Sequence, residues 1–299
     1  MAKRDVTVTP NDPLYITDTD LSFGTVTIKG GGQIIVQTSA KSSIDSLIKD
    51  TGVAKSMIDG VSGAAIEAVS AGQTNGDIII MGTPGQPGRS GQAGPKGQDG
   101  VNGSHASCNW ASGCNDGSAG TGGANGGGAG NASNGTDGGN AMPINLSVGT
   151  LTGTVFVTGG GGNGGNGGDG GQGGAGGHGG NGGNGDSSGA YSRNGYAGGN
   201  GGVGGGGGNG GNGGNGGNGN LINITYKSIV DGQFVPTPLV SSPGLSGNAG
   251  TGGSGGEGGT GGTNGGANGI PGSSGNSGTE GQKGTNYGQP SSFNIVQGS

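Results

Sequence analysis

The chain has 299 residues, of which 90 are glycine, while only 26% are hydrophobic, 3% aromatic and 9% charged. This composition excludes an ordinary globular domain and favours either low-complexity disorder or a fold that glycine itself specifies. A net charge of −6 without any run of Lys or Arg argues against a nucleic-acid partner.

The sequence predicts neither a membrane span nor a classical secretion signal. No stretch of 18 apolar residues occurs, and the opening MAKRDVTVTP lacks the apolar core of a signal peptide. If the protein works outside the cell, we therefore expect it to leave by a non-classical route or as part of a particle.

Residues 1–76 have an ordinary composition and predict a small β-rich anchoring module. LYITD, TVTIK and QIIVQT read as short strands, and the glycines at 30–32 make the turn between the last two. Residues 42–71 have helical apolar spacing, beginning with Ile44, Leu47 and Ile48, which predicts one broken helix or two short helices packed on the strands. The alternative is an exposed stripe through which residues 1–76 dock on a fibre or an oligomer partner.

Residues 77–299 are dominated by glycine at every third position. The period holds in six runs: 82–103, 117–138, 161–185, 200–219, 244–265 and 266–284. The runs at 161–185 and 200–219 have two glycines in each triplet. A flexible linker needs glycine but has no use for a fixed period, so the spacing argues against disorder.

The segments between the runs alternate between two kinds. Those at 77–81, 144–158, 221–240 and 293–297 are rich in β-branched residues and predict junction strands. Those at 104–116, 186–197 and 264–271 read as loops or turns. The order of strand, run, loop, run and strand occurs three times, which predicts three out-and-back hairpins with all strands at one end and all loops at the other.

A period of three predicts a helix with three residues per turn, whose glycine faces let neighbouring backbones bond to each other. The predicted fold class is therefore mostly irregular and all-β: a bundle of about six polyglycine-II helices on the β-rich module with one or two short helices. Runs with two glycines per triplet should have more neighbours than the Gly-X-Y runs. Disorder remains an alternative, as does a collagen triple helix for 82–103.

The sequence offers no recognisable catalytic, cofactor or metal site. The two histidines, His105 and His178, are far apart and neither belongs to a nucleophile motif. GxGxxG-like strings occur throughout the runs, and none opens a helix in a βαβ unit. GGNGGDGGQ lacks the apolar residue and the nine-residue period of calcium-binding β-rolls. We expect a protein that is not an enzyme and needs no cofactor.

The loops hold the residue types that dominate recognition surfaces, chiefly Trp, Tyr and Arg. In the predicted hairpins the loops meet at the free end. The candidate receptor-binding residues are His105, Asn109, Trp110, Asp186, Tyr191, Arg193, Tyr196, Asn268 and Ile270. The alternative is that the aromatic residues only cap the end of the bundle.

The two cysteines, Cys108 and Cys114, flank Trp110 in the first loop. Oxidised, they would stiffen the loop and imply an oxidising, extracellular working place. Two free thiols or a metal site are the alternatives.

The runs GGNGGNGGDGG and GGHGGNGGNG resemble those of polyglycine-II proteins, most of all the receptor-binding tip adhesins of T-even-type phage long tail fibres. The resemblance covers about residues 82–288 in pattern. It implies a sandwich of glycine-rich helices whose distal loops, here 104–116, 186–197 and 264–271, bind a host surface protein or glycan. It also implies an extracellular or virion-associated location. Residues 1–76 do not match the attachment region of those adhesins.

The same repeat pattern resembles the snow-flea antifreeze protein, which makes ice binding an alternative function. The outward positions here are chiefly Asn, mixed with Asp, Gln, His and Glu, and this irregular surface argues against ice. The expected function is thus non-enzymatic binding to a cell surface, and a secreted toxin that finds its target cell through the same region is a further alternative.

Overall fold

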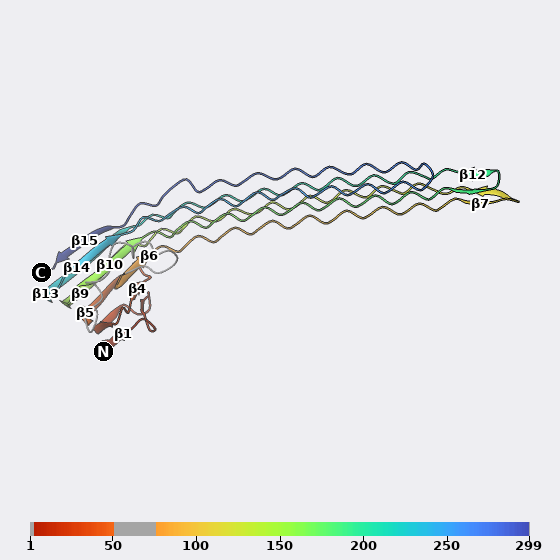
Figure 1. The fold of residues 1–299 in the computed structure, drawn as a ribbon. Helices are drawn as coiled ribbons and strands as arrows, with labels where there is room; N and C mark the ends of the chain where they lie inside the picture. Colours follow the sequence, from red (N-terminus) through yellow and green to blue (C-terminus); the bar gives the residue numbers. More distant parts are fainter. Residues whose placement is uncertain (1–2, 51–75, 299) are drawn as a thin grey trace, which may run out of the picture.

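The computed structural model describes residues 3–50 and 76–298. Two parallel β-sheets form one end of the molecule, glycine-rich runs extend from them as a long shaft, and two short hairpins close the far end (Figure 1). Within these ranges, no helix is long and apolar enough to cross a membrane.

In the base the chain winds around the core, and successive strands belong alternately to the two sheets. The first sheet has the order β1-β3-β5-β9-β13-β15 and the second β14-β10-β6-β4-β2. Neighbouring strands in both sheets are parallel, and each step along the chain adds a strand at the same growing edge. The strands of the first sheet are β1 (Arg4–Val8), β3 (Ser22–Lys29), β5 (Lys41–Asp50), β9 (Ile144–Thr152), β13 (Leu221–Asp231) and β15 (Ser292–Gln297). The strands of the second sheet are β2 (Leu14–Ile16), β4 (Ile34–Val36), β6 (Ile78–Met81), β10 (Val155–Gly160) and β14 (Phe234–Pro238).

The hydrophobic core lies between the two sheets. Alternate residues of each strand point inward, as on β9, where Ile144, Leu146 and Val148 are buried. Gly153 and Gly232 turn the chain from the first sheet to the second with φ of 89° and 88°, a conformation that side chains with a Cβ disfavour. The base is thus a two-sheeted β-solenoid, and it fixes where each glycine-rich run begins and ends.

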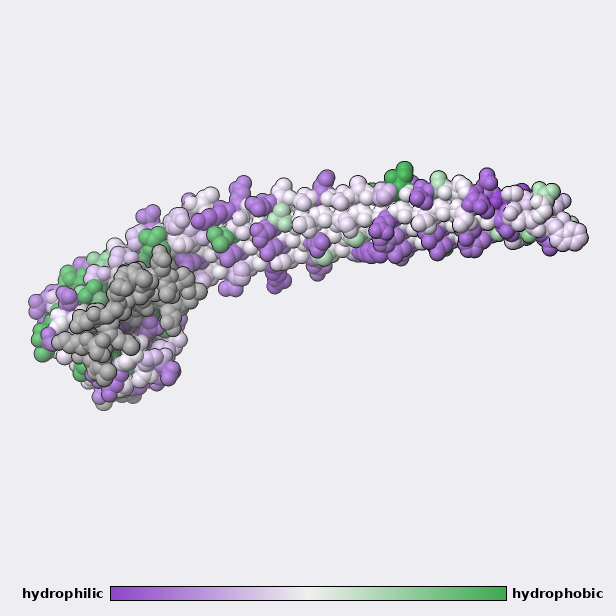
Figure 2. Space-filling model, viewed as in Figure 1, coloured by the Kyte–Doolittle hydropathy of each residue, from purple (hydrophilic) through white to green (hydrophobic). Residues whose placement is uncertain are grey.

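The shaft consists of six extended runs that prolong the two sheets. We number them run 1 (82–106), run 2 (116–143), run 3 (161–185), run 4 (194–220), run 5 (239–262) and run 6 (266–291). Runs 1, 3 and 5 follow the strands of the second sheet, and runs 2, 4 and 6 lead back into the first. Figure 2 shows a shaft surface that is mostly pale and hydrophilic, with only isolated hydrophobic side chains.

Backbone hydrogen bonds join the runs to one another. Within a layer the bonded runs are parallel, as where Gly88 N–H donates to the carbonyl oxygen of Asn166 over 2.7 Å. Between layers the bonded runs are antiparallel, as where Gly165 N–H donates to the backbone carbonyl oxygen of Thr136 over 2.9 Å. Runs 3 and 4 bond to four other runs each, and runs 1 and 6 to two. The runs with two glycines per triplet therefore have the most neighbours.

Side chains satisfy the remaining N–H group of many triplets. Asn212 Oδ1 accepts the N–H of Gln282 in the next run over 2.8 Å, and Asp169 Oδ1 accepts that of Asn248 over 2.8 Å. His178 does the same with Nδ1, which accepts the N–H of Glu257 over 3.1 Å. We call this repeated contact the side-chain ladder. Asparagine at every third position thus completes the bonding between the runs, since an unpaired amide would be costly there.

The predicted fold class is wrong. A bundle of polyglycine-II helices on a module with short helices was expected, whereas the described residues contain no helix and form parallel sheets of six and five strands. The runs are extended segments that continue from these sheets. Within a layer each run keeps the neighbours of the strand it adjoins, and it also bonds to runs of the other layer.

The helix predicted over 42–71 is wrong for 42–50, where the structure has β5. Both edges of β5 are paired, one with β3 and the other with β9, and Ile44 and Leu47 face the core. Pairing on both sides outweighs the helical spacing of the apolar residues. Residues 51–71 lie outside the described residues.

Candidate functional site

The far end of the shaft carries two β-hairpins. The first joins β7 (Ser107–Asn109) to β8 (Gly113–Asn115), and the second joins β11 (Asp186–Ser188) to β12 (Tyr191–Arg193). In the first turn, Asn109 Oδ1 accepts the N–H of Ala111 over 2.9 Å. This local bond and the positive φ of Gly113 (87°) reverse the chain and leave Trp110 at the turn, with 78% of its surface exposed.

A disulfide joins the two strands of the first hairpin. Cys108 and Cys114 face each other across β7 and β8, and their Cα atoms lie 4.0 Å apart. The bond lies next to the turn that carries Trp110. It therefore holds the base of that turn in one conformation.

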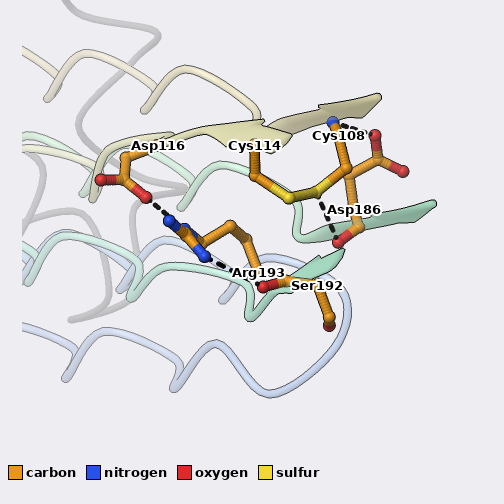
Figure 3. A network of polar contacts seen from close by, with 6 residues as sticks. All are labelled: Cys108, Cys114, Asp116, Asp186, Ser192 and Arg193. Carbon is orange, nitrogen blue, oxygen red and sulfur yellow. Dashed lines mark hydrogen bonds and ion pairs between the residues drawn. A yellow bond between two sulfur atoms is a disulfide. The ribbon is translucent and has the colours of Figure 1, made fainter. Parts of the chain in front are cut away.

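Asp186 ties the two hairpins together (Figure 3). One carboxylate oxygen accepts the N–H of Cys108 and the other accepts that of Ser187, each over 2.8 Å. These two bonds, that from Cys108 above all, hold the pKa of Asp186 below its usual value, and desolvation opposes them. The Cys108 sulfur also lies 3.3 Å from the backbone carbonyl oxygen of Asp186.

A second contact between the hairpin arms involves Arg193. Its Nε lies 2.6 Å from Asp116 Oδ1, and its Nη1 donates to the carbonyl oxygen of Ser192 over 3.2 Å (Figure 3). Both side chains of the ion pair are substantially exposed, so the pair contributes little to stability. Its main effect is to fix the guanidinium group at the surface of the tip.

Three further predicted site residues, His105, Tyr196 and Asn268, make contacts within the shaft. His105 Nδ1 accepts the N–H of Asn184 over 2.8 Å, and Asn268 Oδ1 accepts that of Gly261 over 2.8 Å. Tyr196 is half-buried, and its ring lies where a side chain on Gly117 would be. The structure therefore gives these three residues a role in holding the shaft together.

The third turn stops short of the two hairpins (Figure 1). It is formed by residues 263–265, with Asn264 at φ 66°, and Gly195 N–H donates to the carbonyl oxygen of Asn264 over 3.0 Å. Ile270 is 70% exposed, but it lies on run 6, bonded to Asn200 of the shaft. The structure thus brings Trp110, Asp186, Tyr191 and Arg193 to the tip and places Asn268 and Ile270 below it.

Asp116, the partner of Arg193, is not among the site residues that the sequence predicts. An Asp beside a Gly at the end of a loop is typical of turns and gives no separate signal. In the described part of the chain, no three His, Cys, Asp or Glu side chains group as metal ligands would. The tip presents an exposed indole, a tyrosine that is 45% exposed and a fixed ion pair, which suit contact with another molecule.

Comparison with known proteins gives no relative: no family model, no curated protein and no solved structure matches the chain. The resemblance to tail-fibre adhesins therefore remains one of repeat pattern.

Proposed function

We propose that this protein is a non-enzymatic cell-surface binding protein that presents its two terminal hairpins to a receptor at the end of the shaft. The receptor would be a surface protein or glycan, and the protein would work outside the cell or on a virion. The observation that carries the proposal is Trp110, a largely exposed indole at the end of the shaft on a disulfide-joined hairpin.

The rest of the molecule supports this assignment. Backbone and ladder bonds are made between the runs, so the shaft is a spacer whose backbone polar groups are largely occupied. The runs carry the tip far from the sheets of the base (Figure 1). Aromatic residues and Arg supply large contact areas at low entropic cost, and the tip concentrates them.

The test compares Trp110→Ala and Tyr191→Ala with the unchanged protein in adsorption to host cells. We expect each to lower cell binding by about thirtyfold or more, because a binding hot spot contributes about 2 kcal/mol or more. Val230→Ala is the matched control, because Val230 is 72% exposed but lies on β13 at the base. Normal adsorption of both tip variants, with unchanged thermal unfolding, would refute the assignment.

A measurable thermal hysteresis in the unchanged protein would instead favour the ice-binding alternative. The exposed indole, phenol and ion pair of the tip do not form the flat face of small residues that ice binding would need.

A further inference from the structure

A polar groove lies at the foot of the shaft, on the layer of runs 2, 4 and 6. Run 4 forms its floor, and runs 2 and 6 form its sides. The side chains that line it are Asp137, Asn140, Asn215, Asn218, Asn286, Tyr287 and Gln289. The groove is far from the hairpins and belongs to no site described above.

A break in the glycine period of run 6 creates one side of the groove. Glycine occurs at every third position up to Gly284, but the next glycine is Gly288. Thr285 and Asn286 both donate their N–H to Asn215 Oδ1, each over 3.0 Å, so two residues of run 6 face one residue of run 4. Like a β-bulge, the extra residue redirects a side chain.

The redirected residue is Tyr287, which is 56% exposed beside the groove. The ammonium nitrogen of Lys283 lies 5.7 Å from the centre of its ring. Tyr287 makes no ladder contact, and its ring is the one aromatic group that lines the groove. Its position is therefore a consequence of the inserted residue and is not required by the bonding of the shaft.

The ladder leaves hydrogen-bonding groups free along the floor and one side of the groove. Asn140, Asn215 and Asn218 accept with Oδ1, and their Nδ2 amino groups donate to no group in the described part of the chain. Asp137 accepts the N–H of Asn215 with Oδ1 alone, which leaves its second oxygen able to accept. The groove thus offers a row of amide donors, a carboxylate acceptor and a tyrosine ring.

We propose that this groove binds a neutral oligosaccharide. Sugar hydroxyls both donate and accept, so they match a mixed row of amides and a carboxylate. The face of an aromatic ring packs against the C–H face of a sugar ring. The negative charge of the single carboxylate, Asp137, balances the positive charge of the single nearby ammonium group, Lys283. Nothing in the groove therefore selects an anion such as phosphate.

A second polar hollow lies beyond the groove on the first sheet, and the exposed apolar side chains of Met142 and Leu221 lie on the chain segments between the two. This second hollow, lined by Lys41, Asn145, Ser147, Asn223 and Thr225, begins five residues after Asn140 and Asn218 on the same chain segments. There Asn223 Nδ2 donates to Asn145 Oδ1 over 3.1 Å. Two polar hollows on the same chain segments favour a chain of several sugars over a single one.

The test measures binding of three probes to the full chain by saturation-transfer NMR: the hexasaccharides of glucose, mannose and N-acetylglucosamine. We expect at least one to bind with a dissociation constant below about 1 mM. Tyr287→Ala should weaken that binding at least tenfold, and deletion of Tyr287, which restores the triplet spacing, should abolish it. Gln282→Ala is the control on the same run and should bind normally.

Three results would overturn the proposal. They are binding of none of the three probes, equal binding by Tyr287→Ala and the unchanged protein, and loss of binding in Trp110→Ala alone. The last would place the sugar at the tip. Because cell adsorption is expected to follow Trp110 and oligosaccharide binding to follow Tyr287, failure of one proposal can be told from failure of the other.

Discussion

Two adjacent glycines in run 4 allow a direct test of what holds the shaft together. A Cβ on Gly205 would overlap the carbonyl group of Gly127 and come within 3.0 Å of the carbonyl oxygen of Gly126. A Cβ on Gly206 would meet nothing closer than 3.7 Å. Gly205→Ala and Gly206→Ala therefore add the same methyl group to neighbouring residues, one inside the shaft and one on its surface.

The two substitutions should differ by several kcal/mol. Two backbone bonds join run 2 to run 4 on either side of this contact. Gly126 N–H donates to the carbonyl oxygen of Val203 over 2.8 Å, and Ala129 N–H donates to that of Gly206 over 2.9 Å. Making room for a methyl group separates these backbones, and each buried group left unpaired costs about 1–3 kcal/mol, so Gly205→Ala should cost about 2–6 kcal/mol. Gly206→Ala should be neutral or stabilise by up to about 1 kcal/mol, because alanine restricts the unfolded chain.

Thermal unfolding followed by circular dichroism measures the difference. For a chain of this size, about 3 kcal/mol corresponds to a midpoint lower by about 6–12 °C. Gly206→Ala should unfold within a few degrees of the unchanged protein. Equal midpoints for the two variants would refute the conclusion that the runs are held by close backbone contact.

Other predictions concern the ladder and the tip. His178→Asn keeps an acceptor for Glu257 N–H and should leave the unfolding midpoint unchanged. His178→Ala removes the acceptor and should lower the free energy of unfolding by about 1 kcal/mol. Equal midpoints for the two variants would contradict the role of the side-chain ladder. Replacing Cys108 and Cys114 together by serine should speed amide hydrogen exchange in residues 107–115, since a bridge over so short a loop contributes about 2 kcal/mol, while the centre of the shaft is unchanged. The folded pKa of Asp186 is depressed, so its contribution is present above the ordinary value of 3.8 and is lost as the pH falls through the lower folded value. In a pH titration by NMR, the Cys108 amide signal should therefore shift with a midpoint below 3.8, and a midpoint at or above 3.8 would contradict the bond to Asp186.

The period of the sequence indicates much about the shaft, because most glycines of the runs lie where a Cβ would overlap a neighbouring backbone. One glycine per triplet marks a run with few neighbours, as in run 1, and two mark a run with many, as in run 3. The period alone does not determine what the runs continue from. The parallel neighbours of each run are set by strands such as β10 and β14, whose pairing connects residues about 80 positions apart.

The role of asparagine was not evident from the sequence. An Asn at every third position reads as a neutral surface, and only the spatial register shows that Asn212 Oδ1 bonds to Gln282 N–H. The tip was predictable in composition but not in arrangement. Trp110 and Tyr191 are exposed as a recognition surface requires, whereas His105 and Asn268 have residue types that serve equally well as ladder acceptors.

Runs 5 and 6 are joined by a shorter connection than runs 3 and 4, and this difference explains why the tip is exposed. Gly182 in run 3 donates to Thr260, 78 residues further on, whereas Gly198 in run 4 donates to Ala267, 69 residues further on. The third repeat lacks the residues that form β11 and β12 in the second, and a turn at 263–265 replaces them. Because that turn ends level with Gly185 and Gly195, nothing from the third repeat covers the two hairpins above it. Extending runs 5 and 6 by two triplets each should bring the turn up beside these hairpins, so length alone, with no change in any tip residue, should reduce cell binding.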